Sequence, residues 1–526
     1  MAPGQLTGLV SERSSPFRPA VPPYRRTVVP PFLLPALPAL LHLLRMNPDD
    51  FRHHGHQLVD WMADYMRDVG ALPVTPTVRP GDVLRQLPSS PPENGEPFDT
   101  LLQDFTRIIL PGMTHWNHPG WFAYFPANNS PPSILAEMLT ATLGAQCMSW
   151  ATSPAATELE QATMEWLRQM LGLPTDFTGV IQDTASTATL VALLSARERA
   201  THDAAGVTGL AGTGARLTVY ASSEAHSSID KGVKLAGYGL EQLRRVPVDQ
   251  AYALLPDALD RMIVADRKAG FVPACVVATV GTTSSTAIDP LPRIAEICRQ
   301  HGVWLHVDAA YAGTAAIVPE LRHLFDGAEQ ADSFVFNPHK WMLVNFDCSA
   351  YFVRDREALL ATFKVTPEYL RTAEDREVVN FRDWGIQLGR RFRALKLWFV
   401  IRSYGLEGLR QLVRKHVGLA QELAGWIEAT PGFELMAPVP LGLVCFRYRP
   451  PGVRVDDPRL QDLNAGLLAR VNATRRVHLT HTRLGGQFVI RVAIGQRQTE
   501  RAQVEEVWRL IQEAALEGDG KAGEGS

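Results

Sequence analysis

The first candidate for chemistry is Lys340, a single lysine inside an apolar stretch. Phe334–Phe336 leads up to it and Met342–Val344 follows it. Burying an ammonium group is costly unless the charge is neutralised or paired. A desolvated lysine amine is, however, a good nucleophile for carbonyl carbons and can be held as a Schiff base. We interpret Lys340 as a covalent attachment point. The alternative is a lysine at a strand end whose head group reaches water.

A carboxylate ends a second apolar stretch upstream. The sequence Val303–Val307 is typical of a buried strand, and it ends in Asp308 with small residues after it. Ligands bind outside the carboxyl ends of strands in open α/β sheets. Pyridoxal phosphate needs both groups, a lysine for its aldehyde and an acid that keeps its pyridine nitrogen protonated. The pair Lys340 and Asp308 therefore predicts a pyridoxal phosphate site.

Two motifs resemble a known family. Asn337-Pro338-His339-Lys340-Trp341 and His306-Val307-Asp308-Ala309-Ala310-Tyr311 resemble the pyridoxal-phosphate-dependent group II decarboxylases, most of all the aromatic-L-amino-acid decarboxylases. The resemblance runs from about Met46 to about residue 515 and includes Leu388-Gly389-Arg390-Arg391-Phe392-Arg393. It implies an α/β, aspartate-aminotransferase-like fold (fold type I) with an N-terminal helical segment and a small α+β C-terminal domain. It also implies α-decarboxylation of an L-amino acid to an amine and CO2, in a homodimer with a shared active site.

The resemblance assigns roles residue by residue. Lys340, Asp308, His226 and Tyr369 match the catalytic positions, and His226 matches a histidine that stacks on the pyridine ring and helps hold the substrate. Positions that match cofactor contacts are Ala185, Ser186, His226, Thr283, Asp308, Ala310, Asn337, His339 and Lys340. Asp183 departs from the family, in which glycine is usual. An acid beside a phosphate is unfavourable unless it points away.

Substrate-binding positions are also implied, at Trp116, Tyr124, Phe125, Ala127, Gln146, Met148 and His226. An aromatic-lined pocket with few polar groups suits an aromatic or apolar side chain. Three positions depart from the family: Gln146 and Met148 replace isoleucine and phenylalanine, and Ala127 replaces threonine. A buried Gln146 would need a polar partner. We therefore expect an aromatic substrate, with relative rates unlike those of the mammalian enzymes.

Residues 363–385 are charged and short of core residues. A mobile surface loop explains that composition without any function. In the family a flexible loop closes here over the site and carries a catalytic tyrosine, which Tyr369 matches. Family members with phenylalanine at this position resemble aldehyde synthases, and this chain keeps the hydroxyl. Four alternatives stay open. They are aromatic aldehyde synthesis or transamination, decarboxylation of a non-aromatic amino acid, a cofactor-free homologue without catalysis, and a membrane-associated form anchored by the N-terminal segment.

These residues need a framework of strands and helices. The sequence predicts buried strands at 217–221 and 275–280, a helix at 291–301 ended by Gly302, and an N-cap at Asp289. The segment 179–189 predicts a strand that leads into a helix whose N–H groups face an anion. Strand and helix alternate, which predicts a parallel sheet. Further strands are expected in the smaller domain at 443–448 and 488–492.

Composition narrows the class of protein. The chain has 526 residues, of which 46% are hydrophobic and 20% charged, and its net charge is −3. This composition is that of a soluble globular protein without a basic field for nucleic acid. Five scattered cysteines without a CxxC pair favour reduced thiols in the cytoplasm and no structural zinc. His53, His54 and His56 lack acidic or thiol partners, so we expect no metal there.

The N-terminus differs from the rest of the chain. Residues 1–45 are rich in proline and arginine, and their apolar part is interrupted by Pro30, Pro31, Pro35 and Pro38. It falls short of the roughly 20 apolar residues that a spanning helix needs. We expect a disordered or misannotated extension at 1–45, a helical segment at 46–130, a cofactor domain at 131–411, a small domain at 412–517 and a disordered tail at 518–526.

Overall fold

The computed structural model describes residues 46–365, 367–368, 374 and 377–523. These residues form two compact units. The first comprises residues 46–61 and 88–103, and the second comprises 62–87 and the chain from 104 onward. Among the described residues, no helix combines the length and the apolar composition that crossing a membrane requires. The same part of the chain holds no group of three histidine, cysteine or acidic side chains that could bind a metal.

The first unit is helical. It contains most of α2 (Pro48–Asp68) and α3 (Phe98–Asp104). The ring of His54 packs on Phe98 with 4.6 Å between ring centroids, and its Nδ1 lies 2.8 Å from Gln57 Oε1. His54 is therefore a packing residue with a polar partner.

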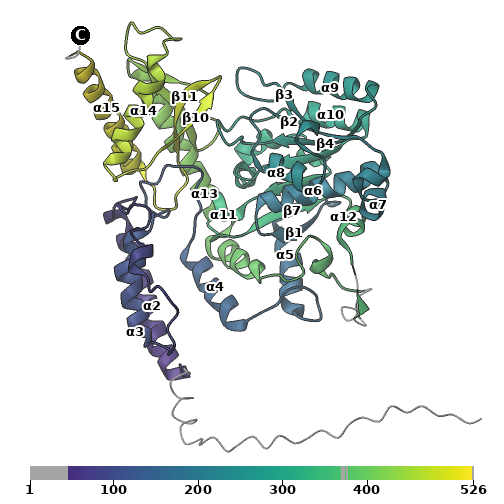
Figure 1. Cartoon of the computed structure of the whole chain (residues 1–526), viewed down its shortest axis with the longest axis horizontal. Helices are drawn as coiled ribbons and strands as arrows, with labels where there is room; N and C mark the ends of the chain where they lie inside the picture. The colour runs from purple at the N-terminus through teal and green to yellow at the C-terminus, as the bar shows by residue number, and fades with distance from the viewer. Residues whose placement is uncertain (1–45, 366, 369–373, 375–376, 524–526) are drawn as a thin grey trace, which may run out of the picture. The chain divides into compact units, whose positions relative to one another are not determined.

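The second unit is built on a seven-stranded sheet in the order β1-β7-β6-β5-β4-β2-β3. Figure 1 labels β1, β2, β3, β4 and β7 of this sheet. Strand β7 is antiparallel to β1 and β6, and the other neighbours are parallel, as the alternation of strand and helix predicts. The strands are β1 (Thr178–Gln182), β2 (Leu217–Ser222), β3 (Leu243–Val246), β4 (Val272–Thr279), β5 (Trp304–Asp308), β6 (Ser333–Phe336) and β7 (Ser349–Val353).

Helices surround this sheet. They are α4 (Pro131–Leu143), α5 (Pro154–Leu171), α6 (Ala185–Thr201), α7 (Ala204–Thr213), α8 (Ser228–Leu235), α9 (Pro256–Lys268), α10 (Leu291–His301), α11 (Pro338–Trp341), α12 (Arg356–Phe363) and α13 (Arg393–Ala429). Gly302 ends α10 with φ 59°, as the sequence predicts.

Both faces of the sheet are covered, because successive side chains of a strand point to opposite faces. On β4, Val276 belongs to the core that includes Ile294 of α10. Its neighbour Val277 belongs to a second core, which includes Val191 of α6. The sheet therefore lies between two apolar layers, and only its strand ends are free to form a site.

A smaller antiparallel sheet follows, in the order β10-β11-β9-β8 (Figure 1). Its elements are β8 (Phe433–Leu435), β9 (Leu443–Tyr448), β10 (Thr480–Leu484) and β11 (Gln487–Ala493), with α14 (Arg459–Ala473) and α15 (Arg501–Gly523). This seven-stranded mixed sheet with its smaller α+β part is an aspartate-aminotransferase-like fold, as expected.

One local prediction was wrong. Asp289 does not cap α10, since its carboxylate accepts hydrogen bonds from the backbone N–H groups of Leu254 and Thr279, each at 2.8 Å. Burial raises the pKa of Asp289 to about 6. The carboxylate therefore joins the end of β4 to a distant loop.

Candidate active site

A cavity of about 220 Å³ opens at the carboxyl ends of β1, β2, β4, β5 and β6. This edge is where open α/β sheets bind ligands. Its lining combines one lysine, one acid, one histidine, five hydroxyl side chains and two aromatic rings. The lining residues are Phe125, Thr184, Ala185, Ser186, His226, Ser228, Thr279, Gly281, Thr283, Asp308, Ala310, Tyr311, Asn337 and Lys340.

Lys340 and Asp308 share this cavity, as predicted. Lys340 lies in the short helix α11, where its N–H donates to the carbonyl of Asn337 at 2.9 Å. Burial lowers the pKa of Lys340, and the charge of Asp308 opposes that shift. Asp308 is 4% exposed, and its Oδ1 accepts a hydrogen bond from Ala310 N at 3.0 Å. A lysine with a lowered pKa reaches its neutral, nucleophilic form more readily.

The backbone of Lys340 is held by Asn128, a buried residue that sequence reasoning missed. Asn128 Nδ2 donates to the carbonyl of Lys340 at 2.8 Å and to that of Gly495 at 2.7 Å. Its Oδ1 accepts from Arg497 N at 3.0 Å. One side chain thus joins the lysine to the segment that follows β11.

The start of α6 lies at the cavity, where it could bind an anion. Thr184 is the N-cap, and its hydroxyl accepts from Thr187 N at 3.4 Å. Ala185 and Ser186 follow in the first turn, where helix N–H groups are unpaired and the helix dipole favours negative charge. These two residues lie at the cavity, as the family resemblance implies.

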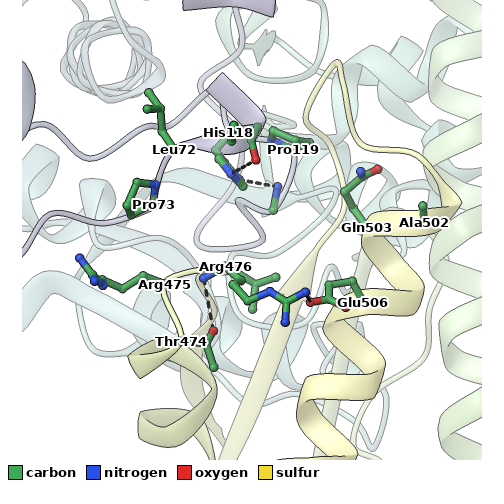
Figure 2. A pocket seen from close by; sticks show the side chains of 14 residues that line it. Leu72, Pro73, His118, Pro119, Thr474, Arg475, Arg476, Ala502, Gln503 and Glu506 are labelled. Atoms are coloured by element: carbon green, nitrogen blue, oxygen red, sulfur yellow. Dashed lines mark hydrogen bonds and ion pairs between the residues drawn. The ribbon is translucent and has the colours of Figure 1, made fainter. Parts of the chain in front are cut away.

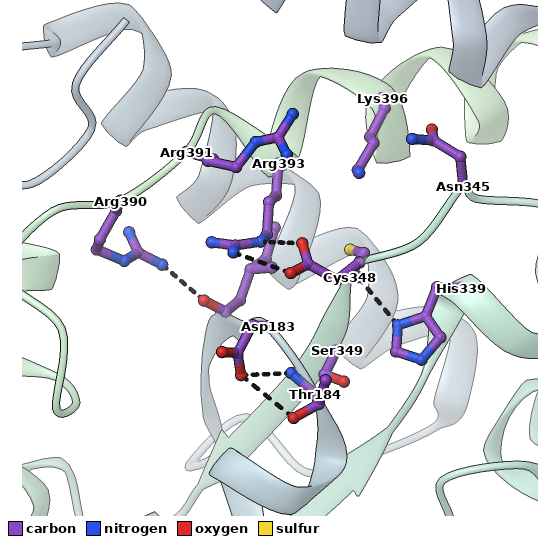
Figure 3. Close-up of polar contacts among 12 residues, drawn as sticks. Asp183, Thr184, His339, Asn345, Cys348, Ser349, Arg390, Arg391, Arg393 and Lys396 are labelled. Carbon is purple, nitrogen blue, oxygen red and sulfur yellow. Dashed lines mark hydrogen bonds and ion pairs between the residues drawn. The ribbon is translucent and has the colours of Figure 1, made fainter. Parts of the chain in front are cut away.

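Asp183 lies on the other side of this strand end. It lines a separate hollow of about 410 Å³ together with Arg390, Arg391 and Arg393 (Figure 3). Its Oδ1 accepts from Thr184 N at 2.6 Å. The carboxylate of Asp183 therefore faces arginines. Although Asp183 is next to Thr184 in the sequence, its charge lies outside the cofactor cavity.

His226 lies at the mouth of the cavity, where it is exposed. Its Nδ1 lies 2.8 Å from Ser228 Oγ and accepts a hydrogen bond from Ser228 N at 3.1 Å. Desolvation by the surrounding protein lowers the pKa of His226; Asp308 raises it and Lys340 lowers it further. Ser228 itself is 5% exposed, so this contact is made inside the wall of the cavity.

Two strands of the small sheet form hydrogen bonds with the loop that follows β4. Arg491 of β11 is 4% exposed and donates to the carbonyls of Thr283 at 2.7 Å and Ser284 at 3.2 Å. Ser284 Oγ also lies 2.9 Å from Thr482 Oγ1 of β10. Since Thr283 lines the cavity, its position depends on the C-terminal part of the chain.

A column of stacked rings forms one wall. Phe125 stacks on Tyr311 with 3.9 Å between ring centroids, Tyr311 on Trp341 with 4.7 Å, and Trp341 on His416 with 6.3 Å. Trp341 Nε1 donates to His416 Nδ1 at 2.9 Å. Lys340 Nζ lies 5.6 Å from the centroid of the Phe125 ring, so the column flanks the lysine.

Several predicted site residues lie outside the cavity. Trp116, Tyr124, Ala127, Gln146, Met148 and His339 are absent from its lining. His339 is buried beneath it, where its Nδ1 accepts from Cys348 N at 3.0 Å and burial lowers its pKa to about 4. Gln146 is exposed, and its Oε1 accepts from Arg390 N at 2.8 Å. Tyr369 lies outside the residues that the structure describes.

Five cavity residues were missed from the sequence: Thr184, Ser228, Thr279, Gly281 and Tyr311. Four of them, Thr184, Ser228, Gly281 and Tyr311, stand within two residues of a predicted contact. Their proximity to Ala185, His226, Thr283 and Ala310 was the available signal.

A further hollow of about 380 Å³ lies between residues 70–73, 118–120, 474–477 and the start of α15 (Figure 2). Two of its polar side chains, Arg476 and His118, have partners. Arg476 pairs with Glu506, and His118 Nδ1 accepts from Gly120 N at 2.8 Å while its Nε2 lies 3.2 Å from the carbonyl of Gly70. The lining has no nucleophile, so we assign no chemistry to it.

The residues of the cofactor cavity suit pyridoxal phosphate. Lys340 would hold the aldehyde, Asp308 the ring nitrogen, and Ala185, Ser186 and Asn337 the phosphate. Each of these groups lines the same cavity. The lining thus supplies a partner for the aldehyde, the ring nitrogen and the phosphate of that cofactor.

Comparisons with known proteins point the same way. Residues 80–449 match the pyridoxal-dependent decarboxylase conserved domain. The chain is 44% identical over 485 residues to aromatic-L-amino-acid decarboxylase of Sus scrofa, which covers 90% of this chain and 97% of that protein. It is 43% identical over 480 residues to phenylacetaldehyde synthase of Arabidopsis thaliana, covering 89% and 96%. The crystal structure of Oryza sativa TDC with PLP and tryptamine has a TM-score of 0.87 and 39% identity, covering 90% of this chain and 99% of that one.

Proposed function

Because the chain belongs to the pyridoxal-dependent decarboxylase family, with pyridoxal 5′-phosphate as its cofactor, we propose that it converts an aromatic L-amino acid into the amine and CO2. The observation that carries this proposal is the placement of Lys340 and Asp308 in one cavity. When bound, pyridoxal phosphate supplies an electron sink for the bond that breaks. Asp308 keeps the proton on the ring nitrogen, and His226 orients the substrate at the mouth.

The aromatic substrate class rests on the relatives and on the rings near the site. Similar proteins include an aromatic-L-amino-acid decarboxylase and a tryptophan decarboxylase, and Phe125 and Tyr311 form part of the cavity wall. Apolar, ring-lined pockets favour aromatic side chains. The relevant experiment is turnover of a panel of amino acids, aromatic, acidic and basic, with amine and CO2 both measured. Faster turnover of glutamate or lysine than of every aromatic substrate would contradict the proposal.

A second candidate is aldehyde synthesis, because phenylacetaldehyde synthase of Arabidopsis thaliana is 43% identical to this chain. We favour the amine as product, since Tyr369 keeps the hydroxyl that can return a proton to the substrate carbon. Aldehyde and hydrogen peroxide are measured in the same assay. Equal amounts of aldehyde and CO2, without amine, would identify the second activity.

We also propose a homodimer in which each subunit completes the site of the other. Helix α4 exposes an apolar stripe at helical spacing, formed by Leu135, Met138, Leu139 and Leu143 with exposed fractions of 52%, 39%, 48% and 66%. Such a stripe suits an interface. Gln146 and Met148 follow this helix and lie outside their own cavity. A shared site lets them reach the partner's cavity.

Mixing two inactive variants tests the shared site. Lys340→Ala removes the lysine of its own site, and Met148→Arg blocks the site of the partner. Refolded together, they form heterodimers with one intact site, so about a quarter of wild-type activity returns if the site is shared. Sedimentation equilibrium gives the mass. No recovery in a mixture that contains heterodimers would contradict the proposal.

We propose that the enzyme works in the cytoplasm. All five cysteines are free and buried, as expected in a reducing compartment. Cell fractionation followed by immunoblotting tests this location. Recovery of the protein in a secreted or membrane fraction would contradict it.

A further inference from the structure

The contact between His226 and Ser228 determines which ring nitrogen of His226 carries the proton. Ser228 N donates to His226 Nδ1 at 3.1 Å. A backbone N–H can only donate, so Nδ1 must offer its lone pair and carry no proton. The second contact, from Ser228 Oγ at 2.8 Å, meets the same nitrogen. A hydroxyl can donate there as well, which adds to the preference for an unprotonated Nδ1.

We propose that Ser228 is a positioning residue that holds His226 as a neutral imidazole with its proton on Nε2. Both donors come from one residue, through its backbone and its hydroxyl. Ser228 is 5% exposed and is the first residue of α8, so its geometry is fixed by the helix. A protonated Nδ1 would face the N–H of Ser228, which cannot accept a hydrogen bond, and the charged ring is therefore disfavoured.

Some charges around the His226 ring favour its protonated form, and others favour its neutral form. Asp308, at the end of β5, and Asp230, in α8, favour the charged ring. Lys340, in α11, and Lys231, in α8, oppose it, and loss of hydration opposes it most, so the pKa of His226 is lowered. The start of α8 adds the positive end of a helix dipole beside Nδ1. The balance agrees with the hydrogen bonds, which decide the tautomer.

The consequence for catalysis rests on the proposed decarboxylation. A neutral ring with Nε2–H can donate one hydrogen bond to a substrate carboxylate and orient it. A charged ring would form an ion pair with the same carboxylate. That pair stabilises the bound substrate more than the transition state, because the carboxylate loses its charge as CO2 forms. Holding His226 neutral therefore lets it orient the leaving group without a strong ground-state interaction.

The tautomer is measured without any turnover. Solid-state ¹⁵N NMR of the sedimented protein, labelled with ¹⁵N-histidine, separates protonated from unprotonated ring nitrogens. His226→Asn assigns the signals by their loss, and the spectra are recorded with and without pyridoxal phosphate. We expect an unprotonated Nδ1 and a protonated Nε2 at pH 7 in both. A protonated Nδ1 in the wild type would overturn the proposal, whether or not the protein decarboxylates amino acids.

The role of the hydroxyl is tested by Ser228→Ala, with Ser228→Thr as the matched control. Alanine keeps the backbone donor and removes the hydroxyl, which destabilises the neutral ring and raises the pKa of His226. The acid limb of kcat/KM should then move to higher pH by about half a unit to one unit. Threonine keeps the hydroxyl and should leave the limb in place. An acid limb at the same pH in the alanine and threonine variants would overturn the role of the hydroxyl.

Discussion

Glu160 and Arg390 form an ion pair beside the end of β1, with 2.6 Å between Glu160 Oε1 and Arg390 Nη2. Their side chains are 3% and 8% exposed. Both residues also bind Ile181 in β1, since Glu160 accepts from its N–H at 2.9 Å and Arg390 donates to its carbonyl at 2.7 Å. The pair thus holds the strand that leads to the start of α6. Asp183 and Thr184 follow two and three residues later.

Glu160→Gln should destabilise the protein, because it leaves the Arg390 charge buried without a counter-charge. We expect a loss of about 3 kcal/mol or more in the free energy of unfolding. Glu165→Gln is the matched control. It lies on the same helix, its partner is Arg168, and its side chain is 47% exposed, so its loss should stay below about 1 kcal/mol. Urea unfolding of both variants measures the difference, and equal losses would contradict it.

Lys340 should carry the covalent label after borohydride reduction of the enzyme with its cofactor. Its place in the cavity sets it apart from Lys396, another buried lysine whose pKa is lowered. Peptide mapping of the reduced protein identifies the labelled residue. Lys340→Arg should bind no cofactor covalently, and a label on another lysine in the wild type would refute the assignment.

Asp183→Gly should change the affinity for pyridoxal phosphate by less than about threefold. The reason is that the carboxylate faces Arg390, Arg391 and Arg393 and lies away from the cofactor cavity. Titration of cofactor-free protein measures this affinity, with Asp183→Asn as a control that removes the charge and keeps the size. An increase of tenfold or more in both variants would show that the charge reaches the phosphate.

Acid should destabilise the fold through three buried histidines. Burial lowers the pKa of His306 and His339 to about 4 and that of His416 to about 3. Their unfolded pKa lies near 6.5, so their contribution is complete above that value and is lost as pH falls towards 4. Near pH 5 almost three protons are taken up on unfolding, so the slope rises from a small value at pH 7 to about 4 kcal/mol per pH unit there.

Urea unfolding at several values between pH 7 and pH 5 measures that slope. His416→Gln removes one of the three titrating groups, so its slope should fall by about a third. An unchanged slope in this variant would show that His416 does not titrate on unfolding.

Tyr369→Phe should keep cofactor binding, lose most amine formation and gain aldehyde with oxygen consumption. Tyr369 lies outside the described residues, so its role stays a prediction from the family resemblance. The physical reason is that proton return must outrun reaction with oxygen. Product analysis by chromatography checks it. Wild-type amine production in the variant would assign the proton transfer to another group.

The sequence alone was sufficient to predict the site residues that stand at a strand end and have a reactive side chain. Lys340 and Asp308 each end an apolar run, so their place at one sheet edge followed from the parallel sheet. Asn128 and Arg491 could not be predicted in this way, because their partners are carbonyl groups that every residue has. Only the folded structure shows which carbonyl accepts a hydrogen bond from which side chain.

Gln146 and Asp289 show a second limit. Gln146 was expected to need a partner within a pocket, and it binds the backbone of Arg390 at an exposed position. Asp289 precedes a proline and a helix, a typical N-cap pattern, yet two distant N–H groups compete successfully for its carboxylate. A local sequence pattern indicates which nearby N–H groups a side chain can bind. It carries no information about donors that are distant in the sequence.

The position of Asn128 bears on when the active site can form during protein synthesis. Its side chain joins Lys340, 212 residues later, to Gly495, 367 residues later. Contacts of such long sequence separation form late, and chains emerge from the ribosome N-terminus first. A nascent chain that has already exposed Lys340 still lacks the segment that fixes its backbone. The lysine should therefore remain unable to retain its cofactor until the last part of the chain has left the ribosome.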